Sequence, residues 1–274
     1  MSAVLAPAAT RPPALKVTQA RVVQSEFTKF RSLRSTVYTM LAGVILMIGL
    51  GAIFSAVSAS QYHTFSAAER ASFNPVSVSL AGVTFAVVAF GVLGVLMMSG
   101  EYSTGMIRSS LTAVPRRLPV LWAKLVVFAA SMFAIALVAS FVSFFLGQAL
   151  LSSHHLNAAI TAPGALRSVI GAALYVTVAG MIGVALGALF RNTAAGIATF
   201  AGVFFVIPPL TQLLPASVST HLTPYLPSTA GDVLWGGMGN VPGALSPWTG
   251  FTLLCGYAVV LIAAAAWRLR HADA

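Results

Sequence analysis

Long apolar runs separated by short polar segments dominate the sequence. Each run holds about twenty residues with almost no charge, enough for a helix rising about 1.5 Å per residue to cross a hydrocarbon layer of ~30 Å. The pattern predicts an all-α integral membrane protein with a six-helix transmembrane domain over residues 36–267. The expected spans are 36–59, 76–98, 118–151, 167–190, 193–214 and 249–267.

The segment before the first span predicts an amphipathic helix. Residues 1–14 are rich in alanine and proline, which is typical of a disordered tail. Farther on, up to residue 35, Val23, Phe27 and Phe30 recur at helical spacing on one face, among several basic residues. We therefore predict a basic helix lying in the membrane interface. A soluble helix that touches no lipid is the alternative.

The stretch between the fifth and sixth spans has a different character. Residues 215–248 are too apolar for a solvated loop, yet they hold too many prolines and glycines for a span. Short re-entrant or interfacial helices at the outer face are predicted there. Pro208 and Pro209 fall inside the fifth run and are expected to bend or end its helix, because each lacks a backbone donor.

Composition and charge define the class of protein and its orientation. The chain is 58% hydrophobic and 7% charged, whereas soluble domains are about a quarter charged. The net charge of +10 does not indicate a nucleic-acid partner, because the basic residues flank apolar runs, where they set topology and meet anionic lipids. With six spans, all but two of the fifteen lysines and arginines lie on one side. The positive-inside rule then places both termini, with the tail 268–274, in the cytoplasm.

Motifs for catalysis or cofactor binding are absent from the sequence. It has no GxxxxGK[ST] loop, GxSxG or HExxH motif, and its one cysteine excludes a cysteine-pair metal site. The histidines of the outer loops could form a metal site, but their scattered positions favour ordinary surface residues. None of the five acids falls inside a predicted span, which disfavours an ion-coupled carrier. We expect a non-catalytic chain without a metal or cofactor of its own.

A charged segment, GEYSTGMIRSSLTAVPRRLPVLWAK, separates the second span from the third at residues 100–124. We predict a short helix that ends at Pro115 and meets a partner protein. On this hypothesis Glu101, Arg108, Arg116 and Arg117 transmit the partner's motion to the spans. The alternative is a solvated loop whose basic residues serve only topology, and it is strongest for the basic residues after Pro115.

Three stretches carry a resemblance to a known family. They are SEFTKFRSLRST at 25–36, GEYSTGMIRSSLTAVPRR with the later Lys124, and PYLPSTAG at 224–231. Together they resemble the permease subunit of a type-2 ATP-binding-cassette exporter, and more closely the small six-helix permeases of actinobacterial drug-export operons. The resemblance covers essentially the whole chain. Met106 stands where the family often has threonine.

The resemblance implies a division of labour in a bacterial plasma membrane. Two permeases, identical or paralogous, would bind two separate ATPase subunits, and those subunits would hold the ATP and Mg. The coupling segment would be formed by Glu101, Tyr102, Gly105, Arg108, Arg116 and Arg117. The connecting helix beside it would use Glu26, Phe27, Phe30 and Arg34.

The uncharged spans suggest the class of cargo. A cavity between two permeases would be apolar, with Gln148 and Tyr175 as candidate polar spots, although each could equally be a helix-packing contact. We expect a hydrophobic or amphiphilic cargo such as a drug, antibiotic or lipid, in preference to a polysaccharide. The alternative function is a membrane-anchored regulatory or scaffold protein without cargo, and an intramembrane enzyme is disfavoured by the missing motifs.

Overall fold

The computed structural model describes residues 18–103, 105, 117–237 and 243–271. Across this part of the chain every regular element is helical. The long helices are α2 (Arg34–Gln61), α5 (Val83–Ser103), α7 (Arg117–Ser152), α8 (Ala165–Phe190) and α13 (Pro247–His271). The shorter ones are α1 (Gln19–Ser32), η1 (Tyr62–Thr64), α3 (Ala67–Ser72), α4 (Pro75–Ser79), α9 (Thr193–Ala201), η2 (Gly202–Val206), α10 (Ile207–Thr211), α11 (Ala216–Leu222), η3 (Thr223–Tyr225) and α12 (Pro227–Trp235).

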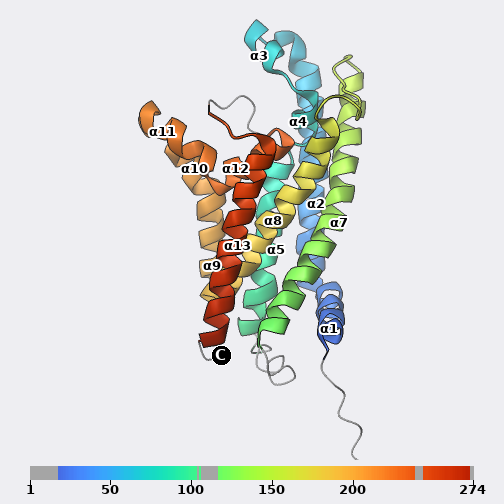
Figure 1. Cartoon of the computed structure of the whole chain (residues 1–274). Coiled ribbons are helices and arrows are strands. Elements are labelled where there is room, and N and C mark those ends of the chain that lie inside the picture. The colour runs from blue at the N-terminus through green and yellow to red at the C-terminus, as the bar shows by residue number, and fades with distance from the viewer. Residues whose placement is uncertain (1–17, 104, 106–116, 238–242, 272–274) are drawn as a thin grey trace, which may run out of the picture.

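Six helical stretches are long and apolar enough to cross a membrane, as the hydropathy pattern predicts. The fifth of them is the continuous run from α9 to α10, and it contains the π-helical turn η2. Helix α1 and the C-terminus lie at one end of the bundle, while α3 and α11 lie at the other (Figure 1). We call these the α1 end and the α11 end. Both described ends of the chain therefore lie on the same side, as six crossings require.

Helix α8 forms the centre of the bundle, and most of its surface is covered by other helices. Close approach to α5 depends on glycines on both helices. A Cβ atom at Gly183 would collide with the carbonyl oxygen of Gly91, and one at Gly94 would collide with that of Gly180. The backbones therefore touch at these points, which is the arrangement that a small-xxx-small pattern permits in a membrane.

The second span differs from the single helix predicted over 76–98. It begins as the short helix α4, breaks at residues 80–82, and resumes as α5. Side chains of α7 donate hydrogen bonds to carbonyl groups around the break. Ser143 Oγ donates to Ser79 O at 2.7 Å, and Gln148 Nε2 donates to Pro75 O at 2.9 Å. A helix can be interrupted at membrane depth when neighbouring helices satisfy its backbone in this way.

Helix α5 also continues to Ser103, five residues beyond the predicted end of the span. The expectation that every acid lies outside the spans is therefore wrong for Glu101, which sits on the last turn of α5. The short predicted helices between the fifth and sixth spans are present as α11 and α12 at the α11 end (Figure 1). Helix α12 is packed between α8 and α13, and its Trp235 is only 2% exposed.

Candidate functional site

Helix α1 turns an acidic residue toward the bundle. Its buried residues are Val22, Glu26 and Phe30, which are four residues apart and so share one face. Of the predicted apolar face, Phe30 packs into the bundle, whereas Phe27 is 49% exposed. Phe27 and Val23 instead line an apolar groove against α7. The carboxylate of Glu26 points inward, where it has charged partners, and Phe27 lies on the outward side of α1.

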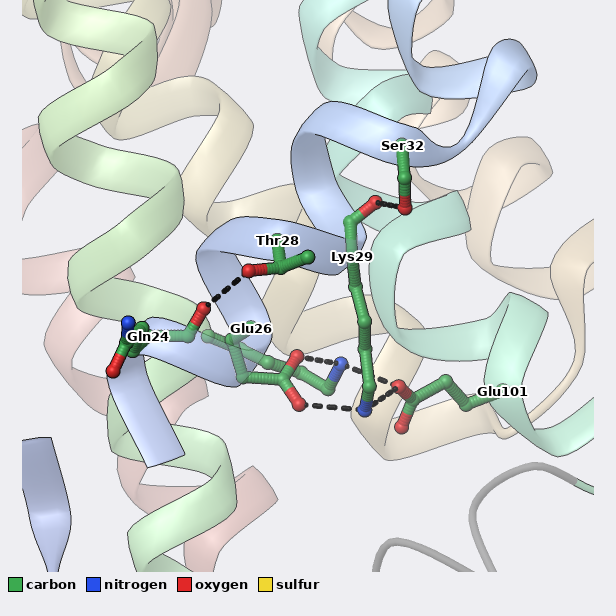
Figure 2. Close-up of polar contacts among 7 residues, drawn as sticks. Gln24, Glu26, Thr28, Lys29, Ser32 and Glu101 are labelled. Atoms are coloured by element: carbon green, nitrogen blue, oxygen red, sulfur yellow. Dashed lines mark hydrogen bonds and ion pairs between the residues drawn. The ribbon is translucent and has the colours of Figure 1, made fainter. Parts of the chain in front are cut away.

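Those partners complete a closed set of four alternating charges, which we call the charge ring: Glu26, Lys29, Glu101 and Lys124. Helix α1 supplies the first two, the last turn of α5 supplies the third, and the second turn of α7 supplies the fourth. Figure 2 shows Glu26 and Lys29 reaching from α1 toward Glu101 on α5. The ring therefore joins three helices, of which α1 is far from the other two in sequence.

Each lysine of the ring contacts both glutamates. Lys124 Nζ lies 2.6 Å from Glu26 Oε2 and 2.8 Å from Glu101 Oε1. Lys29 Nζ lies 2.7 Å from Glu26 Oε1 and 3.0 Å from the same Glu101 Oε1 (Figure 2). These are charge-assisted hydrogen bonds, which are shorter and stronger than neutral ones. The four formal charges cancel, so the ring has no net charge.

The ring lies mostly out of contact with solvent. Glu26, Glu101 and Lys124 are 3%, 4% and 2% exposed. A buried charge is costly unless it is paired and hydrogen-bonded, and removing one partner leaves the other uncompensated. Lys29 is the more exposed member. Burial works against its charge, but its hydrogen bonds to Glu26 and Glu101 outweigh that effect and hold its pKa above the usual value.

The same turn of α5 also meets the connection between α8 and α9. The guanidinium of Arg191 lies over the Tyr102 ring, 5.2 Å from its centroid, and Ser99 Oγ is 2.9 Å from Thr193 Oγ1. Arg191 itself ends α8 with a positive φ of 53°. Arg268 on α13 donates to the carbonyl of Leu189 at the end of α8. Helices α1, α7, α8 and α9 therefore all contact the last part of α5, where the charged segment begins.

The structure brings together only some of the residues predicted for coupling. Glu26 and Glu101 meet in the ring, and Tyr102 lies beside them on α5. Gly105 adopts a left-handed φ of 72°, which suits glycine. Arg34 is exposed at the start of α2. Arg108, Arg116 and the side chain of Arg117 lie outside the described residues.

Sequence reasoning missed the two lysines as members of the site. Lys124 stands out in the sequence only through the family resemblance, whereas in the structure it is buried and bonded to two carboxylates. A usable signal was present. Glu26 and Glu101 are two of only five acids in the chain, and an acid next to an apolar run needs a basic partner. No sequence pattern states which lysine that is.

Gln148 and Tyr175, the two candidate cavity residues, both lie within the helix packing of one chain. Besides its bond to α4, Gln148 accepts a hydrogen bond from the backbone of Ala158 at 2.7 Å. Tyr175 is 2% exposed and faces Asp232 on α12, whose carboxyl also accepts from Trp235 Nε1 at 3.1 Å. Burial raises the pKa of the Asp232 carboxyl to about 7, against the hydrogen bonds from Trp235 and Tyr175, which lower it.

Comparison with known protein families gives a match for this chain. Residues 22–210 match the family described as "ABC-2 family transporter protein". The chain belongs to the ABC-2 transporter family. It is thus a multi-pass membrane protein and a permease subunit of an ATP-binding-cassette transporter. The match runs from α1 through the spans to α10 and includes all four residues of the charge ring. No curated protein matches the chain significantly.

Proposed function

We propose that this ABC-2 permease exports a hydrophobic or amphiphilic compound, such as a drug, antibiotic or lipid, across a bacterial plasma membrane. The energy would come from ATP hydrolysed with Mg by two copies of a separate ATPase subunit, and a second permease, identical or paralogous, would complete the pathway. The α1 end faces the cytoplasm in this proposal. The excess of basic residues at that end supports this orientation.

The observation that carries the proposal is the charge ring. It ties α1 to α5 and α7, the two helices that border residues 104–116. A force applied by a partner to that charged segment would act directly on the ends of α5 and α7. Because the ring joins both ends to α1, these three helices would move as a unit. The structure thus supports a role for α1 as the connecting helix and for Glu101 as a coupling residue.

The test uses the permease assembled with its ATPase partner in lipid vesicles. Glu101→Gln removes one charge from the ring, so we expect co-purification of the ATPase to persist while ATP-driven efflux of a lipophilic dye falls about tenfold or more. The double variant Glu101→Gln, Lys124→Gln restores a ring with no net charge and should recover part of that activity. Glu69→Gln, an exposed acid in the N-terminal capping box of α3 at the α11 end, is the matched control.

Two results would contradict the proposal. Full coupled turnover in Glu101→Gln would remove the ring from the mechanism. Binding of an ATPase without transport of any dye or lipid by the unmodified complex would instead favour the regulatory or scaffold role. That second function has no structural observation of its own in its favour.

A further inference from the structure

A small amphipathic cavity lies next to the charge ring, between α1, α2 and α5. Its volume is about 160 Å³. The apolar part of its wall is formed by Phe30, Leu33, Leu93, Leu96 and Met97. The charge ring forms the polar part, with Ser35 and Thr36 at the start of α2. A cavity with one charged wall and several apolar ones matches a molecule that has a polar head and an apolar chain.

One atom in the wall lacks a hydrogen-bond partner. Glu101 uses Oε1 for both of its lysine contacts, whereas Oε2 is buried without a hydrogen bond within the described structure. The Glu101 side chain is 5% exposed. A buried carboxylate oxygen left unpaired is costly, and a bound ligand that supplied a donor would remove that cost.

The charges of the ring determine what kind of donor suits this oxygen. A cationic head would be attracted by the carboxylate of Glu101 but repelled by the two ammonium groups that already touch its other oxygen. A carboxylate or phosphate head would place a second anion beside Glu101. A neutral hydroxyl or amide N–H avoids both costs and keeps the charge balance of the ring.

The size and position of the cavity indicate how much of the ligand's apolar chain lies inside it. A cavity of this volume holds a molecule about as large as benzene, so it accommodates the head and the first few carbons of a chain. Leu33, on the cavity wall, is 45% exposed and lies between α1 and α2. The remainder of an alkyl chain can leave past Leu33 into the surrounding lipid.

We propose that this cavity binds the hydroxyl or amide head of a neutral amphiphile, which donates a hydrogen bond to Glu101 Oε2. The site is distinct from the coupling role of the ring and requires no ATPase for occupancy. Its failure or success therefore leaves the export proposal untouched. Occupancy would add a contact at the carboxylate that joins α1, α5 and α7.

The test is photoaffinity labelling of the full chain in phosphatidylcholine nanodiscs. The probe is a long-chain alcohol with a diazirine beside its hydroxyl, and labelled peptides are mapped by mass spectrometry. We expect labels between Leu93 and Glu101. Dodecanol should compete at a concentration about tenfold lower than its methyl ether, which has the same chain but no donor. Dodecanoate should compete poorly, because its carboxylate is an anion.

Two glycine variants provide a matched pair that spares the charge ring. A Cβ at Gly100, which lines the cavity, would meet no atom within 4 Å, and the same holds for Gly49 on α2, which does not line it. Gly100→Leu should fill the cavity and lower labelling about tenfold. Gly49→Leu should leave labelling unchanged.

The possible results distinguish a bilayer lipid from a dissolved amphiphile, and two of them would contradict the proposal. Loss of labelling in phosphatidylcholine nanodiscs that contain diacylglycerol, a neutral lipid with a free hydroxyl, would support the site and identify a bilayer lipid as its occupant. Labelling that persists there but yields to dodecanol would support a dissolved amphiphile. Equal competition by alcohol and ether, or full labelling of Gly100→Leu, would overturn the proposal and leave a cavity that holds water only.

Discussion

At the scale of single residues, the buried acids of this permease occupy two different environments. Glu26 and Glu101 each bind two ammonium groups. Asp232, on α12, lies beside the aromatic side chains of Trp235 and Tyr175. The two environments have opposite consequences. The carboxylates of the ring bind cations, whereas burial raises the pKa of Asp232 and favours its neutral form.

Lys124→Met tests the ring as a structural unit. It leaves two buried carboxylates with Lys29 as the one lysine of the ring, so we expect the free energy of unfolding to fall by about 3–5 kcal/mol. Adding Glu101→Gln to that variant should cost less than the sum of the two single changes, because the second change removes one uncompensated charge. Denaturant unfolding in detergent measures all three variants, and strict additivity would contradict a coupled ring.

Asp232→Asn tests the buried acid on α12. Its folded-state pKa of about 7 lies above the unfolded value, so the folded state binds more protons over the range between them. Stability from this group is therefore complete below about pH 4 and declines as the pH rises through about 7. We expect the Tm of the unmodified protein to fall between pH 5 and pH 8, and the asparagine variant to lose that part of the slope. A pH profile unaltered by the substitution would contradict the assignment.

At the scale of the helices, contact between backbones decides how α5 and α8 pack. The pair is close because glycines face one another, and the break between α4 and α5 persists because α7 supplies hydrogen bonds to it. Both features depend on one helix fitting another. Neither follows from the hydropathy of a single segment.

A pair of glycine-to-alanine changes tests the contact between α5 and α8. Gly183→Ala places a methyl group against the carbonyl of Gly91, and we expect a loss of about 1–3 kcal/mol from overpacking. Gly256→Ala on α13 adds the same methyl group where no atom lies within 4 Å. That control should be neutral or stabilising by about 0.5–1 kcal/mol, since alanine favours helix. Thermal unfolding in detergent compares the two, and equal effects would contradict the close contact.

At the scale of the whole molecule, the proposed orientation follows from charge and from an even number of crossings. The single cysteine makes this simple to test, because Cys255→Ser gives a background without thiols. In that background, Glu69→Cys should react with an impermeant maleimide added to intact cells. Arg270→Cys should react only after the membrane is opened. The reverse pattern would invert the topology and place the charge ring outside.

The number of spans, the amphipathic α1 and the short helices after the fifth span could all be predicted from the sequence. Backbone buried in hydrocarbon requires long uncharged helices, and such helices can be recognised from the composition of each segment alone. The charged segment could likewise be located, because its residues stand out from the apolar runs on both sides.

Tertiary structure alone decided which charges meet. Glu26 and Lys124 are 98 residues apart, and no periodicity links them. Their pairing depends on the direction in which α1 leaves α2, on the extension of α5 to Ser103, and on the burial of the first turns of α7. The orientation of α1 has the same origin, since the carboxylate of Glu26 must be paired where it is buried. Composition determined the membrane fold of this protein, and the packing of distant helix ends determined its candidate site.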